Sequence, residues 1–568
     1  MERKWWQKEV IYQIYPRSFY DTNDDGIGDI KGITKKLSYL KDLGITMIWI
    51  CPIYKSPMDD NGYDISDYYQ INPEFGNMKD LEELIAHGKE KGIKIVLDLV
   101  INHTSDEHPW FQDVLNDPLN SEYKDYYIIK NGNDGMPPNN WRSVFGDSVW
   151  KPFKNTDDLY YFHSFGSKQP DLNWENKHVR EALFEMVNYW LDKGIAGFRV
   201  DAITFIKKDQ NYDNHPADGV DGLVKVTKKG RNQPGIEKFL HELQERTFAK
   251  HDCVTIGEAP GVSYDQYGDF IGENGYFSMI FDFRYADLDV ASGSEWFKRI
   301  DWNIKDLKEL IFTSQIEIQK VGWGANFLEN HDQNRSISKY IKTEKNRHFY
   351  SASMLGAMFF FLRGTPFIYQ GQEIGMTNFK RKSIKEFDDI SSIDQYYRSI
   401  KEGHSEEDAL HFVNLRSRDN ARTPFQWNSS NYGGFSNVEP WLKMNKNYTE
   451  INVELQEKDP QSLLSFYKKM IRIRQSSDAS ECLIYGLFEP ILRDHPTILA
   501  YKRTATEKEV RCYFNFSDNP NTIHLDESFY FIVLDNYQHE KETIWGQTIK
   551  LKPFQSLLLM KKEGNVNE

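Results

Sequence analysis

The stretch Gly197–Ala202, with the sequence GFRVDA, is typical of a short buried β-strand that ends in charged side chains. Phe198 and Val200 alternate with Arg199 and Asp201, and the chain then leaves the strand. Because burying a carboxylate beside a guanidinium costs free energy, the pair is either a structural ion pair or part of a functional site. The nearby cation would lower the pKa of the aspartate and keep it ionised, as a nucleophile requires.

Similar short apolar runs recur along the chain up to Tyr369, and helical periodicity fills most of the spacers between them. The runs are Val10–Ile14, Met47–Cys51, Ile93–Ile101, Gly197–Val200, Val254–Ile256, Phe277–Phe283, Ala325–Leu328 and Pro366–Tyr369. A glycine follows each of the clearest helical spacers, which are Leu37–Leu43, Asp80–Lys91 and Val179–Lys193. Strands that alternate with helices in this way predict an α/β fold with a parallel (β/α)8 barrel, although periodicity alone also allows a doubly wound sheet.

Two segments outside this repeat indicate further domains. The spacer after the third run is rich in Asn, Asp, Gly, Pro and aromatic residues and is too long for an ordinary loop, so we expect a small inserted domain over residues 104–171. From residue 483 the alternation of apolar and polar residues is typical of antiparallel strands. We therefore expect a barrel formed by 1–103 and 172–482 and a C-terminal β-sandwich domain over 483–568.

Polar side chains gather where the predicted strands end. They are His103, Arg199, Asp201, Glu258, His331 and Asp332, and they follow or end the third, fourth, fifth and seventh runs. In a parallel barrel these strand ends converge on one face, and active sites lie on that face. The sequence therefore predicts one pocket that holds three carboxylates, two histidines and an arginine.

Two carboxylates that face one another can cleave a glycosidic bond, one as the nucleophile and the other as the proton donor. Asp201 is the candidate nucleophile. Glu258 follows an apolar run that would keep its pKa high, so it is the candidate acid. We expect Asp332 to stabilise positive charge in the transition state, and His103 and His331 to donate hydrogen bonds to sugar hydroxyls unless they are structural.

The acidic loop 21–29, with the sequence DTNDDGIGD, is similar to the first nine positions of an EF-hand loop. Position 12 is Gly32 rather than the usual Glu, and no EF-hand helix pair is evident. We expect a structural Ca²⁺ ion at this loop and no organic cofactor, with a metal-free Asp-rich turn as the alternative. The ligands would be Asp21, Asn23, Asp25 and Asp29, together with the backbone carbonyl of Ile27.

Composition narrows the range of partners. The net charge of −15 disfavours nucleic acid and anionic membranes and favours a neutral substrate. The longest apolar stretch, Ala352–Leu362, is too short to span a bilayer, and the first residues lack the apolar core of a signal peptide. The four cysteines lie far apart and form no disulfide framework, which fits a reducing compartment. We expect a cytoplasmic monomer.

Together these motifs resemble the α-amylase superfamily of glycoside hydrolases, and most closely its oligo-1,6-glucosidase and α-glucosidase branch. The barrel motifs are DLVINH (98–103), GFRVD (197–201), GEA (257–259) and ENHD (329–332). Three further segments resemble markers of the branch: DNGYDISDY (60–68), QPDLN (169–173) and RDNARTP (418–424). The resemblance covers nearly the whole chain.

The resemblance implies a role for each catalytic carboxylate. Asp201 would be the nucleophile, Glu258 the acid and base, and Asp332 the stabiliser of the transition state. The reaction would retain the α configuration through a covalent glucosyl-enzyme. The implied substrates are short α-glucosides such as isomaltose, panose and maltose.

The resemblance also implies how the terminal glucose is held. Asp60 and Arg418 would bind it at the closed end of the pocket, which would make the enzyme exo-acting. Tyr63 would stack beneath the glucose, and Phe165 from the inserted domain would add a wall. The acidic loop matches the calcium loop of the family.

Some positions depart from the pattern of the branch. Oligo-1,6-glucosidases usually carry Val after the nucleophile, whereas α-1,4-acting relatives often carry Ala or Thr, and this chain has Ala202. The smaller side chain leaves room near the second sugar and predicts a relaxed linkage preference. The segment Phe281–Tyr285 and Asn334 also differ from common family residues and lie near strand ends.

Other activities of the same family stay open. A sucrose isomerase or transglucosidase would carry a charged loop with two arginines, which we do not find clearly after His331. A trehalose-6-phosphate hydrolase needs a basic pocket for the phosphate, for which Lys207, Lys208, Lys225 and Arg284 are candidates. A catalytically inactive binding protein is the remote alternative, since this chain keeps all three carboxylates.

Overall fold

The barrel forms as the sequence predicts. The computed structural model describes residues 2–291, 295–526, 529–537, 543–545 and 548–561. Its eight parallel barrel strands are β1 (Ile11–Ile14), β2 (Met47–Ile50), β5 (Lys94–Val100), β10 (Gly197–Asp201), β12 (Val254–Gly257), β13 (Met279–Phe281), β14 (Gly324–Asn326) and β15 (Thr365–Tyr369). Because β1 pairs with both β2 and β15, the sheet closes on itself, which rules out the doubly wound alternative.

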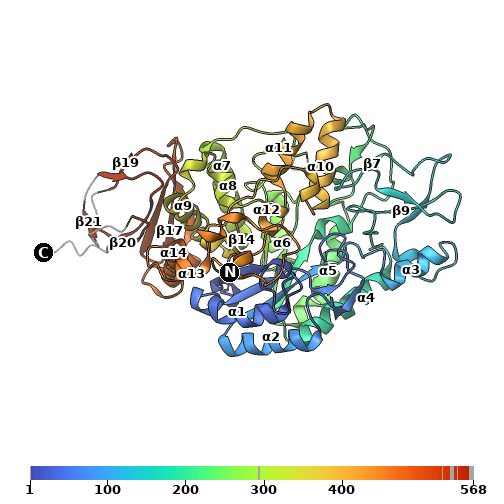
Figure 1. Cartoon of the computed structure of the whole chain (residues 1–568), viewed down its shortest axis with the longest axis horizontal. Helices are drawn as coiled ribbons and strands as arrows, with labels where there is room; N and C mark the ends of the chain where they lie inside the picture. The colour runs from blue at the N-terminus through green and yellow to red at the C-terminus, as the bar shows by residue number, and fades with distance from the viewer. Residues whose placement is uncertain (1, 292–294, 527–528, 538–542, 546–547, 562–568) are drawn as a thin grey trace.

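Helices between these strands surround the barrel (Figure 1). They include α1 (Ile30–Leu43), α2 (Met78–Lys91), α4 (Lys177–Asp192), α5 (Ile236–Arg246), α6 (Tyr267–Ile271), α7 (Ile304–Val321), α8 (Ser336–Tyr340) and α9 (Phe349–Phe360). Gly44 and Gly92 end α1 and α2 in the left-handed conformation, with φ of 99° and 70°. Only glycine adopts that conformation at no steric cost, so the glycines mark the helix ends as expected.

The predicted insertion folds against a second, distant segment. It holds α3 (Pro109–Asn116) and a three-stranded antiparallel sheet of β6 (Ile129–Asn131), β9 (Leu159–Phe162) and β8 (Trp150–Pro152). Its β7 (Trp141–Arg142) pairs with β11 (Val224–Lys225), which follows barrel strand β10 in the chain. Trp141, Phe162, Tyr212 and Val224 share one small core, so the wall above the barrel is built from both segments.

After β15 comes a helical region and then the C-terminal sheets. The helices are α10 (Ile390–Lys401), α11 (Glu406–Arg416), α12 (Asp419–Arg422), α13 (Val453–Glu457), α14 (Leu463–Ser476) and α15 (Ser480–Tyr485). The charged segment 380–419 is therefore partly helical. The predicted domain boundary at 482/483 falls inside α15, and the first C-terminal strand starts later, at Leu487.

The C-terminal strands are antiparallel, at the left of Figure 1. Six form one sheet in the order β16 (Leu487–Ile491), β17 (Ile498–Ala505), β18 (Lys508–Asn515), β23 (Ser556–Lys561), β20 (Phe529–Asp535) and β21 (Thr543–Trp545). β19 (Asn521–His524) and β22 (Thr548–Leu551) form a second small sheet, and β3 (Tyr54–Lys55) pairs with β4 (Asp67–Ile71) beside the barrel. Apolar side chains of both C-terminal sheets share one core.

Among the helices that the structure describes, none has the length and apolarity that a membrane crossing needs.

Candidate active site

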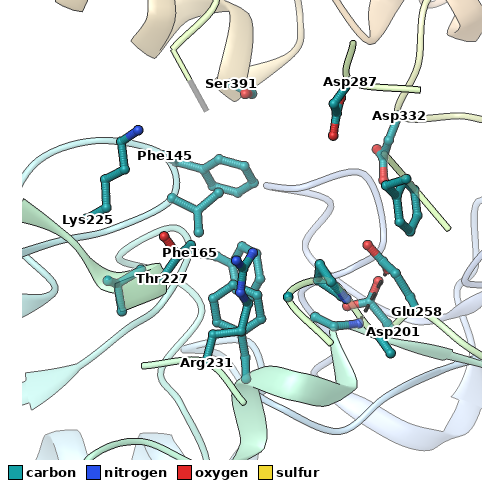
Figure 2. Close-up of a pocket in the computed structure, with 18 of the residues that line it drawn as sticks. Phe145, Phe165, Asp201, Lys225, Thr227, Arg231, Glu258, Asp287, Asp332 and Ser391 are labelled. Carbon is teal, nitrogen blue, oxygen red and sulfur yellow. Dashed lines mark hydrogen bonds between the residues drawn. The ribbon is translucent and has the colours of Figure 1, made fainter. Parts of the chain in front are cut away.

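A pocket of about 650 Å³ opens at the C-terminal ends of the barrel strands. The strand ends contribute Asp201, Glu258 and Asp332, and the insertion contributes Phe145 and Phe165. Figure 2 shows the three carboxylates on one side of the pocket and the two phenylalanines on the other. Helix α10 lines it as well, so the barrel, the insertion and the helical region each supply a wall. This volume lies within the usual range for small-molecule sites.

The three predicted catalytic carboxylates come from three different strands. Asp201 is the last residue of β10, and Glu258 directly follows β12. Asp332 lies in the segment after β14. Directly after Asp201 the backbone of Ala202 adopts the left-handed region, with φ of 43° and ψ of 33°. This unusual conformation for a residue other than glycine turns the chain sharply and is typical of functional sites.

Arg199 joins two of these carboxylates. Its Nη1 donates to Oδ1 of Asp98 at 2.8 Å and to Oδ1 of Asp201 at 2.7 Å, and its Nη2 donates to Glu258. The arginine is almost fully buried and lies behind the pocket wall rather than in it. Asp201 and Glu258 therefore bind different nitrogens of one guanidinium.

Burial dominates the acidity of this pair. It raises the pKa of Glu258 to about 8, with Arg199 opposing the shift and the negative charge of Asp201 adding to it. Burial likewise raises the pKa of Asp201 to about 7, although Arg199 pulls it down. The expectation that Arg199 would leave Asp201 with a lowered pKa is therefore wrong, because desolvation outweighs the one cation. Burial thus raises the pKa of both carboxyl groups, and the raised pKa of Glu258 suits its proposed role as the acid.

Asp332 has the opposite balance. Burial alone would raise its pKa, but neighbouring cations hold the pKa of this carboxyl well below its usual range. Arg422 Nη2 donates to its Oδ1 at 2.9 Å, and Arg418 Nη1 lies 3.3 Å from the same oxygen. Asp332 is therefore ionised at neutral pH and can oppose positive charge in the pocket.

Asp60 and Arg418, which were predicted to hold the terminal glucose, both line the pocket and form an ion pair. Arg418 Nη2 donates to Oδ1 of Asp60 at 3.0 Å, and its Nε donates to Oδ1 of Asp389 at 2.7 Å. Gln169 Nε2 donates to the other oxygen of Asp60 at 3.1 Å. The ring of Phe145 lies 5.2 Å from the guanidinium carbon of Arg418. Asp60 and Arg418 are therefore fixed in the pocket wall by their contacts with each other, Gln169 and Asp389.

Tyr63 lines the pocket and packs on His331 behind it. The two rings are nearly parallel, with centroids 5.2 Å apart and planes 8° apart. His331 is fully buried, its Nδ1 lies 2.7 Å from Gln13 Nε2, and its Nε2 lies 2.6 Å from the Tyr63 hydroxyl. Burial lowers its pKa to about 3. His331 is therefore neutral and supports Tyr63 and Asp332, which differs from the expected contact with sugar hydroxyls.

His103 does reach the pocket and lies against Phe165, with ring centroids 5.2 Å apart. Its Nε2 donates to the backbone carbonyl of Tyr63 at 3.0 Å, and burial lowers its pKa to about 4. Phe165 also packs near Phe145 and Phe205, at 5.7 Å and 5.0 Å between centroids. The predicted aromatic wall is thus a cluster of three phenylalanines.

Several side chains of the site were not among the sequence predictions. Asp389, Phe145 and Arg231 lie in segments without a recognisable motif, so no sequence signal identified them. Arg422 belongs to the quoted segment 418–424, and its charge at the fourth position after Arg418 was the available signal. Because its contact with Asp332 depends on the fold, spacing alone could not assign it a partner.

The acidic loop forms a compact turn around Asp21. The Oδ1 of Asp21 accepts the backbone N–H of Asn23 at 3.0 Å, and Asn23 Nδ2 donates to Oδ2 of Asp25 at 2.9 Å. Asp29 instead caps α1, accepting the N–H groups of Thr22 and Gly32. In the described part of the chain no three Asp, Glu, His or Cys residues are placed to share a metal ion. The oxygen donors suit Ca²⁺ chemically, and the Ca²⁺ site stays a prediction.

The chain is similar to known proteins over nearly its whole length. Residues 13–485 match the family model "Alpha amylase, catalytic domain". An oligo-1,6-glucosidase of Bacillus cereus is 41% identical and covers 99% of this chain and 100% of its own, and a trehalose-6-phosphate hydrolase of Bacillus subtilis is 38% identical over 98% of each chain. Among solved structures, an isomaltulose synthase from Klebsiella sp. LX3 matches with a TM-score of 0.93 and 38% identity, over 99% of this chain and 100% of that one.

Proposed function

Because the chain belongs to the alpha-amylase family of glycoside hydrolases, we propose that it is a retaining, exo-acting α-glucosidase that releases terminal glucose from short α-glucosides. One observation carries the proposal. Asp201 and Glu258, whose pKa values are raised to about 7 and about 8, bind one buried guanidinium beside a pocket that Asp60 and Arg418 also line.

The geometry supports a double displacement. Inverting enzymes hold their two carboxyl groups far enough apart for a water molecule between them. Here Asp201 and Glu258 bind the two terminal nitrogens of the single Arg199 guanidinium, which supports the closer spacing that a retaining mechanism uses. Asp201 would attack C1 of the glucose while Glu258 gives its proton to the leaving oxygen, so the glycosidic bond breaks and a glucosyl ester forms.

The second step returns both residues to their starting states. Ionised Glu258 would take a proton from a water molecule, whose oxygen attacks C1 and breaks the bond to Asp201. Two inversions at C1 give net retention. In both steps the ionised Asp332, held by Arg418 and Arg422, would stabilise the oxocarbenium-like transition state.

We propose α-1,6 linkages as the main target, with α-1,4 linkages also accepted. The similarity to oligo-1,6-glucosidases supports the first part. Ala202 supports the second, because it lines the pocket beside the nucleophile with a side chain of one carbon. The basic residues that the sequence offered as phosphate receptors are each paired with a carboxylate. None of these four is therefore free to bind a phosphate; they are Lys207, Lys208, Lys225 and Arg284.

The compartment, the oligomeric state and the metal ion are proposed from the composition of the chain and from the chemistry of the acidic loop. We propose a cytoplasmic monomer that binds neither nucleic acid nor membrane, supported by the net charge of −15 and by four free cysteine thiols. We also propose a structural Ca²⁺ ion at the acidic loop, held by oxygens of Asp21, Asn23, Asp25 and Ile27. Light scattering of the purified protein measures its molar mass in solution and so tests whether it is a monomer.

The deciding experiment compares kcat/KM for isomaltose, maltose, sucrose and trehalose 6-phosphate, with identification of every product. The proposal expects glucose from isomaltose and, at a lower or similar rate, from maltose. Isomaltulose or trehalulose from sucrose would show an isomerase instead. Exclusive cleavage of trehalose 6-phosphate would show the phosphate-specific activity, and no turnover of any substrate would support a binding protein.

A further inference from the structure

Among the described residues, one cation in the pocket has no carboxylate partner. The basic residues that line it are Arg142, Lys225, Arg231, Arg284, Arg398, Arg416 and Arg418. Ion pairs to Asp or Glu neutralise all of them but one. Within the residues that the structure describes, the exception is Arg231, whose guanidinium has neither an ion pair nor a hydrogen bond to protein.

The guanidinium of Arg231 is nevertheless held in a defined place. It lies against Gly261, where a Cβ would come within 2.6 Å of its Nε and 2.9 Å of its Cζ. Its other neighbour is the ring of Phe205, whose centroid is 5.9 Å from Cζ. Only a glycine at position 261 leaves room for this packing, and Gly261 also has a φ of 83°.

This position lies on the leaving-group side of the site. Gly261 is the third residue after Glu258, whose proton must reach the leaving oxygen. Figure 2 shows the Arg231 guanidinium turned into the pocket beside Phe165 and across from Asp332. The second sugar of a bound substrate would therefore pass between the carboxylates and Arg231.

A half-buried guanidinium without a counter-charge is unfavourable unless a ligand supplies one. Burial lowers the pKa of Arg231, since no carboxylate offsets the lost hydration. Planar guanidinium groups bind carboxylate and phosphate oxygens through two parallel N–H donors. Every other pocket cation already has such a partner from the protein.

We propose that Arg231 is the receptor for an oxyanion on the leaving sugar, so that α-glucosides with a carboxylate or phosphate on that sugar are preferred substrates. The inference rests on the proposed α-glucosidase activity and names the substrate class of the same site. Neutral disaccharides are still cleaved, because Arg231 can donate to hydroxyl groups as well. The chemistry of bond cleavage at Asp201 and Glu258 is unchanged.

Two matched pairs of substrates test the proposal. Isomaltobionate and isomaltitol share the α-1,6 linkage and differ in a carboxylate against a hydroxymethyl group, whereas trehalose 6-phosphate and trehalose differ in the phosphate. Wild type should show a kcat/KM for the anionic member of at least one pair roughly ten- to a hundredfold above that of the neutral member. The more strongly preferred pair identifies carboxylate or phosphate as the natural group.

The variants separate this role from general damage. Arg231→Gln should bring the ratio of kcat/KM for the anionic member to that for the neutral member of each pair close to one, whereas Arg231→Lys should keep part of the preference. Arg284→Gln is the matched control, because Asp282 already neutralises that guanidinium at 2.9 Å. Equal kcat/KM for both members of each pair in wild type, or an unchanged preference in Arg231→Gln, would overturn the proposal.

A binding measurement distinguishes failure of this inference from failure of the proposed function. Asp201→Asn, which cannot turn over substrate, is titrated with isomaltobionate and isomaltitol in a calorimeter. Tighter binding of the acid, lost in Asp201→Asn/Arg231→Gln, supports the oxyanion receptor even if no disaccharide is hydrolysed. Equal binding of both compounds contradicts the receptor even if isomaltose is cleaved well.

Discussion

The backbone N–H of Ala202 lies 3.4 Å from Oε2 of Glu258, so the residue after the proposed nucleophile contacts the proposed proton donor. The two residues follow adjacent barrel strands, β10 and β12. A side-chain change at position 202 therefore acts on the leaving-group side of the pocket and on the position of the acid at once.

Replacing Ala202 with Val should shift the linkage preference toward isomaltose. The larger side chain narrows the space near the second sugar, and the ratio of kcat/KM for isomaltose to that for maltose should rise several-fold. The left-handed φ of 43° is also unfavourable for a β-branched residue, which should cost about 1–3 kcal/mol of stability. Ala202→Gly is the control: it relieves the backbone and keeps the space, so its ratio should not rise. An unchanged ratio in Ala202→Val would show that this position does not control linkage.

The roles of the two carboxylates can be read from azide products. Asp201→Ala should lose at least a thousandfold in kcat/KM, and azide in the vacated space should attack α-glucosyl fluoride to give β-glucosyl azide. Glu258→Ala still forms the glucosyl-enzyme from an activated substrate, so azide should give α-glucosyl azide. Nuclear magnetic resonance identifies the anomers, and the reverse pattern would exchange the two assignments.

Activity should follow a bell-shaped pH profile of kcat/KM. Below the pKa of Asp201, about 7, the nucleophile is protonated and cannot attack. Above the pKa of Glu258, about 8, the acid has lost the proton that the leaving group needs. The maximum should therefore lie between these values. α-Glucosyl fluoride needs no acid, so its alkaline limb should be absent, and a persistent alkaline limb would argue against Glu258 as the acid.

Removing the charge of Asp60 should weaken binding of the terminal glucose. Asp60→Asn loses a charged acceptor of hydrogen bonds, and kcat/KM for isomaltose should fall roughly ten- to a hundredfold. Asp59→Asn is the matched control, because the neighbouring Asp59 pairs with Lys168 on the surface and does not line the pocket. Equal losses in the two variants would mean that Asp60 acts through the loop rather than through the sugar.

Calcium should stabilise the acidic loop. If the ion binds only the folded state, adding Ca²⁺ to one hundred times its Kd raises the free energy of unfolding by about 2.7 kcal/mol. Tm should therefore rise when Ca²⁺ is added back to protein that has been treated with a chelator. Asp25→Asn should reduce this gain. Asp24→Asn changes a residue of the same loop that is not a predicted ligand and should keep it. A Tm that is insensitive to Ca²⁺ and to chelator would favour the metal-free turn.

The barrel could be predicted because each strand is a local apolar run with a glycine or a polar residue at its end. The ends of the strands were predicted less exactly. The sixth run was predicted over Phe277–Phe283, whereas β13 spans Met279–Phe281. Phe283 continues the apolar pattern after the strand because it packs on Phe281 and Phe327. Burial, rather than strand pairing, explains the extra apolar residues.

The gathering of Asp201, Glu258 and Asp332 in one pocket could be predicted for the same reason, since each lies at or shortly after a strand end. Contacts between distant segments could not. Asp389 binds Arg418 across a loop, and Arg231 owes its place to Gly261, thirty positions later in the chain. The raised pKa of Asp201 could not be predicted from the sequence either, because it depends on how far burial outweighs a single neighbouring charge.

The parallel pairing of β7 with β11 ties the insertion to the segment that follows the nucleophile. Trp141 and Tyr212, from the two sides of this junction, stack with centroids 5.6 Å apart. An engineer who exchanged residues 104–171 for those of a relative would leave half of a shared core behind. The unit that can be exchanged between relatives is therefore discontinuous. A chimera must carry residues 203–230 together with the insertion, because both segments build the shared core and the pocket wall.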